Sequence, residues 1–204
     1  MSMKNEAART SCCMKDIVLE NVSKSFGDVR VLENLSLTFP AGEITCIKGP
    51  SGSGKTTLLK LIEGVEKPDS GTISGVSGKM AVVFQENRLS DNFSAVSNIR
   101  AVTGRSLSKD EIAGHLRELE LGDALTKKTG EFSGGMKRRV AIARAICFDA
   151  PLVIMDEPFK GLDAALREKT IQYVKRHTAG KTLIVVTHDD ADVALLGGRL
   201  VTLG

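Results

Sequence analysis

Beyond residue 14, the chain opens with an alternating pattern of hydrophobic and polar side chains. Residues 17–22 and 31–37 both follow this pattern, and a turn at Gly27 and Asp28 separates them. Alternation with a period of two is typical of strands that bury one face, and a short turn between two such strands favours antiparallel pairing. The sequence therefore predicts an antiparallel β subdomain at the start of the fold.

Short apolar runs then alternate with helical patterns. Strands are predicted at residues 43–47, 71–75, 79–84, 152–156, 182–187 and 200–203, and helices at about 57–62, 135–147 and 163–177, with a short helix before the last strand. Strands that alternate with helices indicate an α/β fold with a mostly parallel sheet covered on both faces. Ligands of such sheets bind at the carboxyl ends of the strands.

The segment from about residue 87 to residue 132 has no strand pattern and is predicted to be an inserted helical subdomain. Ser108 and Glu111 form a capping box, which predicts a helix start. The apolar face of that helix would consist of Ile112, Leu116 and Leu119. His115 lies beside this face, and since the sequence places no carboxylate and histidine group around it, we expect it to serve packing or solvation.

Length and composition are consistent with one domain over residues 15–204, preceded by a flexible leader over residues 1–14. The 204 residues are 42% hydrophobic, and the formal net charge is only +3, so charge does not indicate a nucleic acid or anionic lipid partner. We expect the run Lys137-Arg138-Arg139 to be the solvated face of a helix. No apolar stretch approaches the roughly 18 residues that span a bilayer, and a cytoplasmic location is expected.

The four cysteines show no metal-ligand spacing. Cys12 and Cys13 are adjacent, which rarely allows two thiols to chelate one metal, and Cys46 and Cys147 are isolated. We expect Cys46 and Cys147 to be small buried apolar residues in a reducing compartment.

The most specific motif lies between the predicted strand at 43–47 and the helix that follows it. It fits G-x-x-x-x-G-K-[ST], the phosphate-binding loop. Glycines let backbone N–H groups approach phosphate oxygens, Lys55 supplies a positive charge to the β- and γ-phosphates, and the Thr56 hydroxyl is a Mg²⁺ ligand. The residues expected at the nucleotide are Gly49, Pro50, Ser51, Gly52, Ser53, Gly54, Lys55, Thr56 and Thr57.

Polar residues end three further strands and would complete the site. Asp156 and Glu157 follow the strand at 152–156, and we assign Asp156 to the metal and Glu157 to the base that polarises the attacking water. Gln85 could ligate Mg²⁺ or orient water, and His188 could bond the γ-phosphate. The sequence thus predicts a site for a nucleoside triphosphate and Mg²⁺.

A second glycine-bearing turn, Ser133-Gly134-Gly135, opens a helix and would form a second phosphate-binding helix N-terminus. A single nucleotide site does not need two such helix N-termini. If two chains pack head to tail, however, this turn of one chain can close over the triphosphate held by the other.

With these motifs in order, the chain from about residue 17 to residue 203 resembles the nucleotide-binding subunit of an ATP-binding-cassette (ABC) transporter. The motifs correspond to the family's Walker A loop, Q-loop at Gln85, signature at residues 133–135, Walker B strand, D-loop at residues 161–163 and switch histidine at His188. By this resemblance Phe26 would stack on adenine, and Asp163 would lie near the nucleotide. Without the resemblance, Phe26 would simply be read as a core residue.

The resemblance implies that ATP joins two subunits, that Glu157 activates water, and that loss of the γ-phosphate lets the dimer open. The expected partners are a second copy, transmembrane permease subunits that contact the helical insert, and a solute-binding protein; the chain would sit on the inner face of the membrane. Within the family it is most similar to importers of nitrate, sulfonate and taurine. It departs from them at Asp91 and Asn92, where Pro-Trp is usual, and at Arg138, where Gln is frequent.

Two classes of alternative remain open. A non-transport cassette ATPase, in lipoprotein extraction, cell division or nucleic-acid work, shares the motifs, but the nucleic-acid type usually has coiled coils or two cassettes in one chain. A small-molecule kinase shares the phosphate loop but should lack the turn at residues 133–135.

Overall fold

The computed structural model describes residues 15–76 and 78–204. The leader expected at residues 1–14, with Cys12 and Cys13, lies outside the described residues. Among the described residues, no helix combines the length and the apolar character that a membrane span requires.

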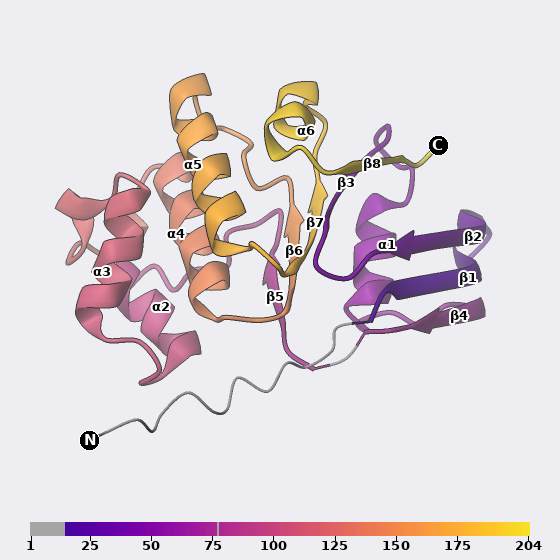
Figure 1. The fold of residues 1–204 in the computed structure, drawn as a ribbon, viewed down its shortest axis with the longest axis horizontal. Coiled ribbons are helices and arrows are strands. Elements are labelled where there is room, and N and C mark those ends of the chain that lie inside the picture. The colour runs from indigo at the N-terminus through magenta and orange to yellow at the C-terminus, as the bar shows by residue number, and fades with distance from the viewer. Residues whose placement is uncertain (1–14, 77) are drawn as a thin grey trace, which may run out of the picture.

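Two sheets form the framework (Figure 1). The first is antiparallel, in the order β2-β1-β4, with β1 at Ile17–Phe26, β2 at Val29–Phe39 and β4 at Ser70–Ser74. The second is parallel, in the order β5-β6-β7-β3-β8. Its strands are β3 at Ile44–Lys48, β5 at Met80–Val83, β6 at Leu152–Asp156, β7 at Thr182–Val186 and β8 at Arg199–Thr202. The predicted α/β class with an antiparallel β subdomain is confirmed.

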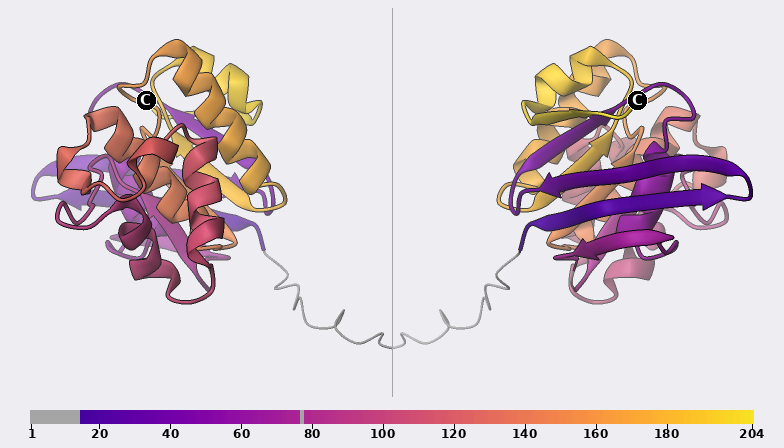
Figure 2. Two further views of the ribbon diagram at one scale, coloured as in Figure 1. Left: turned by 90° about the vertical axis from the view of Figure 1, so that its left-hand side faces the viewer. Right: turned by 90° about the vertical axis from the view of Figure 1, so that its right-hand side faces the viewer.

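Helices cover both faces of the parallel sheet. On one face, α1 at Lys55–Ile62 lies between the parallel sheet and the antiparallel strands. The right-hand view of Figure 2 shows these antiparallel strands side by side in front of α1. On the other face lie α4 at Gly134–Cys147 and α5 at Ala164–His177. The short α6 at Asp190–Leu196 leads into β8.

The segment between β5 and α4 contains α2 at Ala95–Thr103, α3 at Lys109–Glu118 and the short 3-10 turns Gly122–Ala124 and Thr129–Glu131. The Ser108 side chain accepts from the Glu111 backbone N–H, and the Glu111 side chain accepts from the Ser108 backbone N–H, so the predicted capping box is present. Ile112 and Leu116 are fully buried. The apolar face of α3 therefore packs inward, as predicted.

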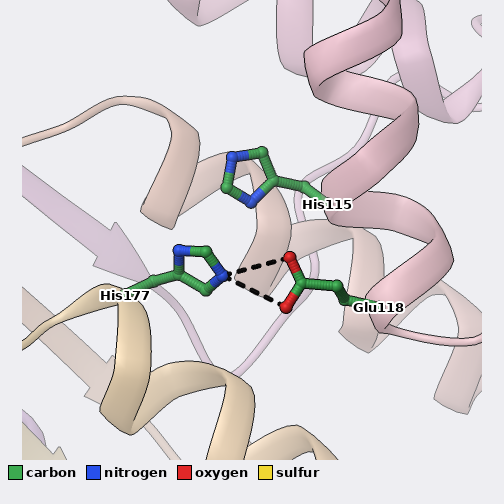
Figure 3. A group of neighbouring side chains, drawn as sticks. All are labelled: His115, Glu118 and His177. Carbon is green, nitrogen blue, oxygen red and sulfur yellow. Dashed lines mark hydrogen bonds and ion pairs between the residues drawn. The ribbon is translucent and has the colours of Figure 1, made fainter.

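The expectation that no carboxylate and histidine surround His115 is wrong. Glu118 on the same helix and His177 at the end of α5 lie beside it (Figure 3). The physical reason is tertiary packing: α3 and α5 lie together, and the two histidines meet although 62 positions separate them in the sequence.

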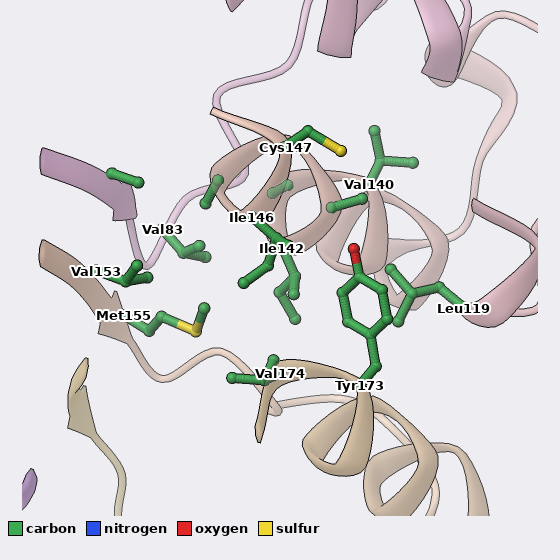
Figure 4. Packing of buried hydrophobic residues seen from close by; sticks show 14 of the residues in the cluster. Val83, Leu119, Val140, Ile142, Ile146, Cys147, Val153, Met155, Tyr173 and Val174 are labelled. Carbon is green, nitrogen blue, oxygen red and sulfur yellow. The ribbon is translucent and has the colours of Figure 1, made fainter. Parts of the chain in front are cut away.

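Alternate residues of the central strands point into two hydrophobic clusters, one on each face of the sheet. Ile154 and Ile184 join α1 and the antiparallel strands, whereas Val153 and Met155 join the helical side. Figure 4 shows the helical side, where Leu119 and Tyr173 pack beside Val140 of α4. The two helices between β5 and α4 are thus part of the same core as α4 and α5.

Cys46 and Cys147 are buried as expected. Burial, with the nearby Asp192 adding to it, raises the pKa of Cys46 to about 11. Burial alone raises the pKa of Cys147 to about 12. Both thiols therefore stay protonated and behave as apolar side chains.

The expected solvent exposure of the run Lys137-Arg138-Arg139 is wrong for its two arginines. Arg138 is 6% exposed and Arg139 7%. Arg139 Nη1 donates to the carbonyl of Leu119, at 2.6 Å, and Arg138 donates to backbone carbonyls that follow β5. Buried guanidinium groups require such partners, and these partners come from segments remote in the sequence.

Candidate nucleotide site

The phosphate loop connects β3 to α1, as the sequence predicts. Gly54 precedes α1 with a φ of 85° and has no side-chain cap, so the first N–H groups of the helix remain available to an anion. Gly49 has to be glycine because a Cβ there would lie 2.3 Å from the Leu203 carbonyl oxygen. A close backbone contact therefore fixes the start of the loop, and a glycine with positive φ fixes its end.

Lys55 folds back over this loop. Its ammonium donates to the carbonyls of Gly49 at 2.8 Å and Pro50 at 2.7 Å, and the residue is only 8% exposed. A positive charge is therefore held at the centre of the loop, where phosphate oxygens would converge.

Thr56 and Asp156 face each other across the site, with 3.5 Å between the hydroxyl and a carboxylate oxygen. Burial and the neighbouring Glu157 raise the pKa of Asp156, more than Thr56, Arg138 and Lys55 lower it. A bound cation would offset the cost of burying this carboxylate. Hydroxyl and carboxylate oxygens are the ligands that Mg²⁺ prefers, so the residues fit the metal.

Glu157 is held in an uncommon backbone conformation, with a φ of 48°. Its carboxylate lies 2.7 Å from His188 Nε2 and 2.9 Å from Lys160 Nζ. Burial raises the pKa of Glu157, but Lys160 and His188 together outweigh burial and place it below the ordinary value. The carboxylate is thus ionised at neutral pH and able to accept a proton, and a strained backbone at such a residue supports a functional role.

These residues converge on one pocket of about 350 Å³. It is lined by Val31, Ser51, Gly52, Gly54, Lys55, Thr56, Thr57, Gln85, Asp156, Glu157 and His188. The structure therefore brings together the loop and the three strand ends that the sequence singled out. Val31 is the one lining residue that sequence reasoning missed, because only the packing of β2 over the loop places it there.

Phe26 ends β1 and is 45% exposed, so it is not a core residue. The Lys24 ammonium lies 5.3 Å from the centre of its ring. Phe26 is not among the residues that line the pocket, although its side chain is exposed to solvent.

The turn at Ser133 and the D-loop also lie outside that pocket. The Ser133 side chain caps α4 by accepting from the Met136 N–H at 3.3 Å, and Asp163 caps α5 by accepting from the Leu166 N–H at 3.0 Å. The two segments are neighbours, since a Cβ on Gly135 would lie 3.5 Å from the Gly161 carbonyl oxygen. Within a single chain, therefore, neither the Ser133 turn nor Asp163 lines the pocket at the phosphate loop.

Arg138 has a clear role although the sequence did not explain it. Its guanidinium donates to the Phe84 carbonyl at 2.5 Å and to the Gln85 carbonyl. Burial lowers the pKa of Arg138, while Asp156 and Glu157 counteract that effect. Arg138 thus ties the helix that begins at the Ser133 turn to the backbone that carries Gln85.

The segments around Asp91, where the sequence departs from related importers, are also tied to α4. Lys137 Nζ lies 2.8 Å from the Asp91 carboxylate, and the Gly130 N–H donates to the Asp91 carbonyl. Asp91 therefore contributes to the contact between the inserted segment and the start of α4.

Comparisons with known proteins agree with this geometry. Residues 32–160 match the protein family described as ABC transporter. The chain is 36% identical to the glucose import ATP-binding protein GlcV of Saccharolobus solfataricus, over 94% of this chain and 63% of that protein. It is also 36% identical to the taurine import ATP-binding protein TauB of Roseobacter denitrificans, over 93% of this chain and 78% of that protein.

Among solved structures, the chain resembles the dimeric structure of MJ0796, a bacterial ABC transporter cassette. The TM-score is 0.80 and the identity 30%, over 92% of this chain and 94% of the cassette. The expected similarity to taurine importers is confirmed, although a sugar importer subunit is equally similar. By its sequence, its fold and its phosphate site, the chain belongs to the ABC transporter family, as an ATP-binding cassette.

Proposed function

We propose that the chain binds ATP with Mg²⁺ in the pocket at the phosphate loop and hydrolyses it to ADP and phosphate. The convergence of Lys55, Thr56, Asp156 and Glu157 on this pocket carries the proposal. Thr56, Asp156 and Gln85 would hold Mg²⁺, which neutralises charge on the phosphates. The Lys55 ammonium would leave the loop carbonyls and turn to the β- and γ-phosphates.

Glu157 is the base in this proposal. Its carboxylate takes a proton from water as the water oxygen bonds to the γ-phosphorus, and the bond from that phosphorus to the bridging oxygen breaks to release ADP. In the structure His188 and Lys160 both contact the Glu157 carboxylate. His188 would exchange this contact for the γ-phosphate, which frees Glu157 for catalysis.

We further infer that two chains close over two nucleotides head to tail. The turn at residues 133–135 and the nearby Asp163 lie away from the chain's own pocket, so a second copy is needed to bring them to a phosphate. The similarity to a dimeric cassette supports this arrangement. Phe26 would stack on adenine beside the loop.

In this proposal the dimer drives a permease that imports a small solute. A solute-binding protein is a further partner, and no nucleic acid is expected to bind. The relatives named above support import, and in that role the chain would sit on the cytoplasmic face of a membrane. A pocket of about 310 Å³ lies between β5, α2 and α4, lined by Met80, Ala81, Val82, Phe84, Val102, Arg144, Ala145 and Phe148. Because β5 leads directly to Gln85, a permease segment bound in this pocket would contact the strand that carries Gln85 to the nucleotide site.

The partner is tested by recovery from native membranes. Tagged Glu157→Gln chain, held in its ATP-bound form, is expected to co-purify with a polytopic membrane protein, identified by mass spectrometry. The same chain with Lys55→Ala added serves as the matched control and should recover less. Recovery of soluble or nucleic-acid-bound partners alone would contradict transport and favour a non-transport cassette ATPase.

The link from α4 to Gln85 is tested with Arg138→Gln, which restores the residue frequent in related subunits. Because a glutamine side chain is shorter and carries one nitrogen where the guanidinium donates through two, we expect the free energy of unfolding to fall by about 2 kcal/mol. We also expect kcat for ATP hydrolysis to fall about tenfold as Gln85 shifts from its position near Asp156. Urea titration and phosphate release measure the two effects, and the exposed Arg105→Gln is the control. An unchanged kcat would show that Arg138 does not position Gln85.

A further inference from the structure

His115, Glu118 and His177 form a compact group away from the nucleotide pocket. His115 and Glu118 stand three positions apart on α3, so they share one face of that helix, and His177 lies at the end of α5. One ring nitrogen of each histidine and one carboxylate oxygen lie within 4.8 Å of one another. Figure 3 shows the three side chains pointing toward a common centre.

The spacing of these atoms suits a metal ion. Two ligands of a tetrahedral Zn²⁺ lie about 3.3 Å apart, given metal–ligand distances near 2.0 Å. The separation of His177 Nε2 from each Glu118 carboxylate oxygen is already 3.3 Å. The His115 ring nitrogen lies within 4.8 Å of the other two ligand atoms and would have to move closer to complete the set.

The surroundings hold the two imidazoles in place. Tyr173 is fully buried, and its ring lies 4.5 Å from the His177 ring and 6.0 Å from the His115 ring, measured between centres. Its hydroxyl lies 3.0 Å from His115 Nδ1. The site is open on its outer side, since the Glu118 side chain is 38% exposed and the His177 side chain 29%. An ion can therefore enter from solvent and keep water as a fourth ligand.

We propose that His115, Glu118 and His177 bind one divalent transition-metal ion of the Zn²⁺ class, which fastens α3 to α5. Two imidazoles and a carboxylate with one open position form a recognised ligand set for Zn²⁺. The ion competes with a group already present, because Glu118 also pairs with Arg176 at 2.8 Å. This competition makes the affinity moderate, in the micromolar range. The proposal is independent of the proposed ATPase function.

The test is titration of the metal-free chain with Zn²⁺ against a chromogenic indicator, and with Co²⁺ followed by its visible spectrum. The background carries Cys12→Ser and Cys13→Ser, so that these thiols do not bind the metal. We expect one ion per chain, a tetrahedral Co²⁺ spectrum without thiolate bands, and a rise in the thermal unfolding midpoint. His115→Ala or His177→Ala should weaken binding at least 100-fold, on the order of the loss of a ligand.

Three further variants make the result specific. His188→Ala removes the third histidine of the chain, which lies beside Glu157, and should leave Zn²⁺ affinity unchanged. Glu118→Gln covers the case in which a histidine variant fails to fold, and should also lose binding. Arg176→Gln removes the competing cation and should strengthen binding severalfold. Lack of saturable micromolar binding, or binding that survives in both histidine variants, would overturn the proposal.

Discussion

Glu157→Gln is expected to lower kcat for ATP hydrolysis at least 100-fold, the usual contribution of a general base, while ATP still binds. Glutamine keeps the size of the side chain but has one acceptor oxygen where the carboxylate has two, and it cannot accept the proton from water. The ionised carboxylate between His188 and Lys160 is the only group that the proposed reaction uses for this step. Phosphate release measures kcat, and equilibrium titration with ATP measures binding.

The matched control is Glu168→Gln, which alters an exposed glutamate on α5 and should hydrolyse ATP at the normal rate. Normal turnover in Glu157→Gln would show that another group takes the proton. Loss of both binding and turnover would instead indicate that Glu157 supports the fold of the site.

Lys55→Ala is expected to weaken ATP binding by roughly 100-fold, the range of hydrogen bonds to charged groups. The ammonium is held over the loop by the carbonyls of Gly49 and Pro50, so its charge already lies where phosphates would enter. Alanine removes both that charge and the contact that closes the loop. Isothermal titration with ATP and Mg²⁺ measures the change.

Lys60→Ala is the control for this substitution, because Lys60 lies on the same helix but is exposed. Its ATP affinity should match that of the unchanged chain. Equal affinity in Lys55→Ala would contradict the assignment of this lysine to the phosphates.

Local signals explain what could be predicted from the sequence. The phosphate loop depends on glycines and a lysine within nine residues, and the start of α3 depends on Ser108 and Glu111 alone. Neighbouring residues decide such features, so their structure follows from the sequence directly. The strand ends at Asp156 and His188 were predicted for a related reason, since parallel strands present their carboxyl ends at one edge.

Features that depend on distant segments could not be predicted. Charge alone suggested that Arg138 is solvated. Instead its side chain is buried, and its guanidinium donates to carbonyls more than 50 positions earlier in the chain. His115 and His177 meet only because α3 packs beside α5. Likewise β4 was predicted as a strand, but only its pairing with β1 shows that it belongs to the antiparallel sheet.

In the proposed mechanism, ATP joins two copies of this chain across the phosphate loop and the Ser133 turn. The most direct test is the molar mass of Glu157→Gln in solution, by light scattering, with Mg²⁺ and with or without ATP. We expect the mass of one chain without ATP and of two chains with it, and Ser133→Arg should prevent the increase without loss of ATP binding. A mass that stays at one chain while ATP is bound would contradict ATP-driven dimerisation.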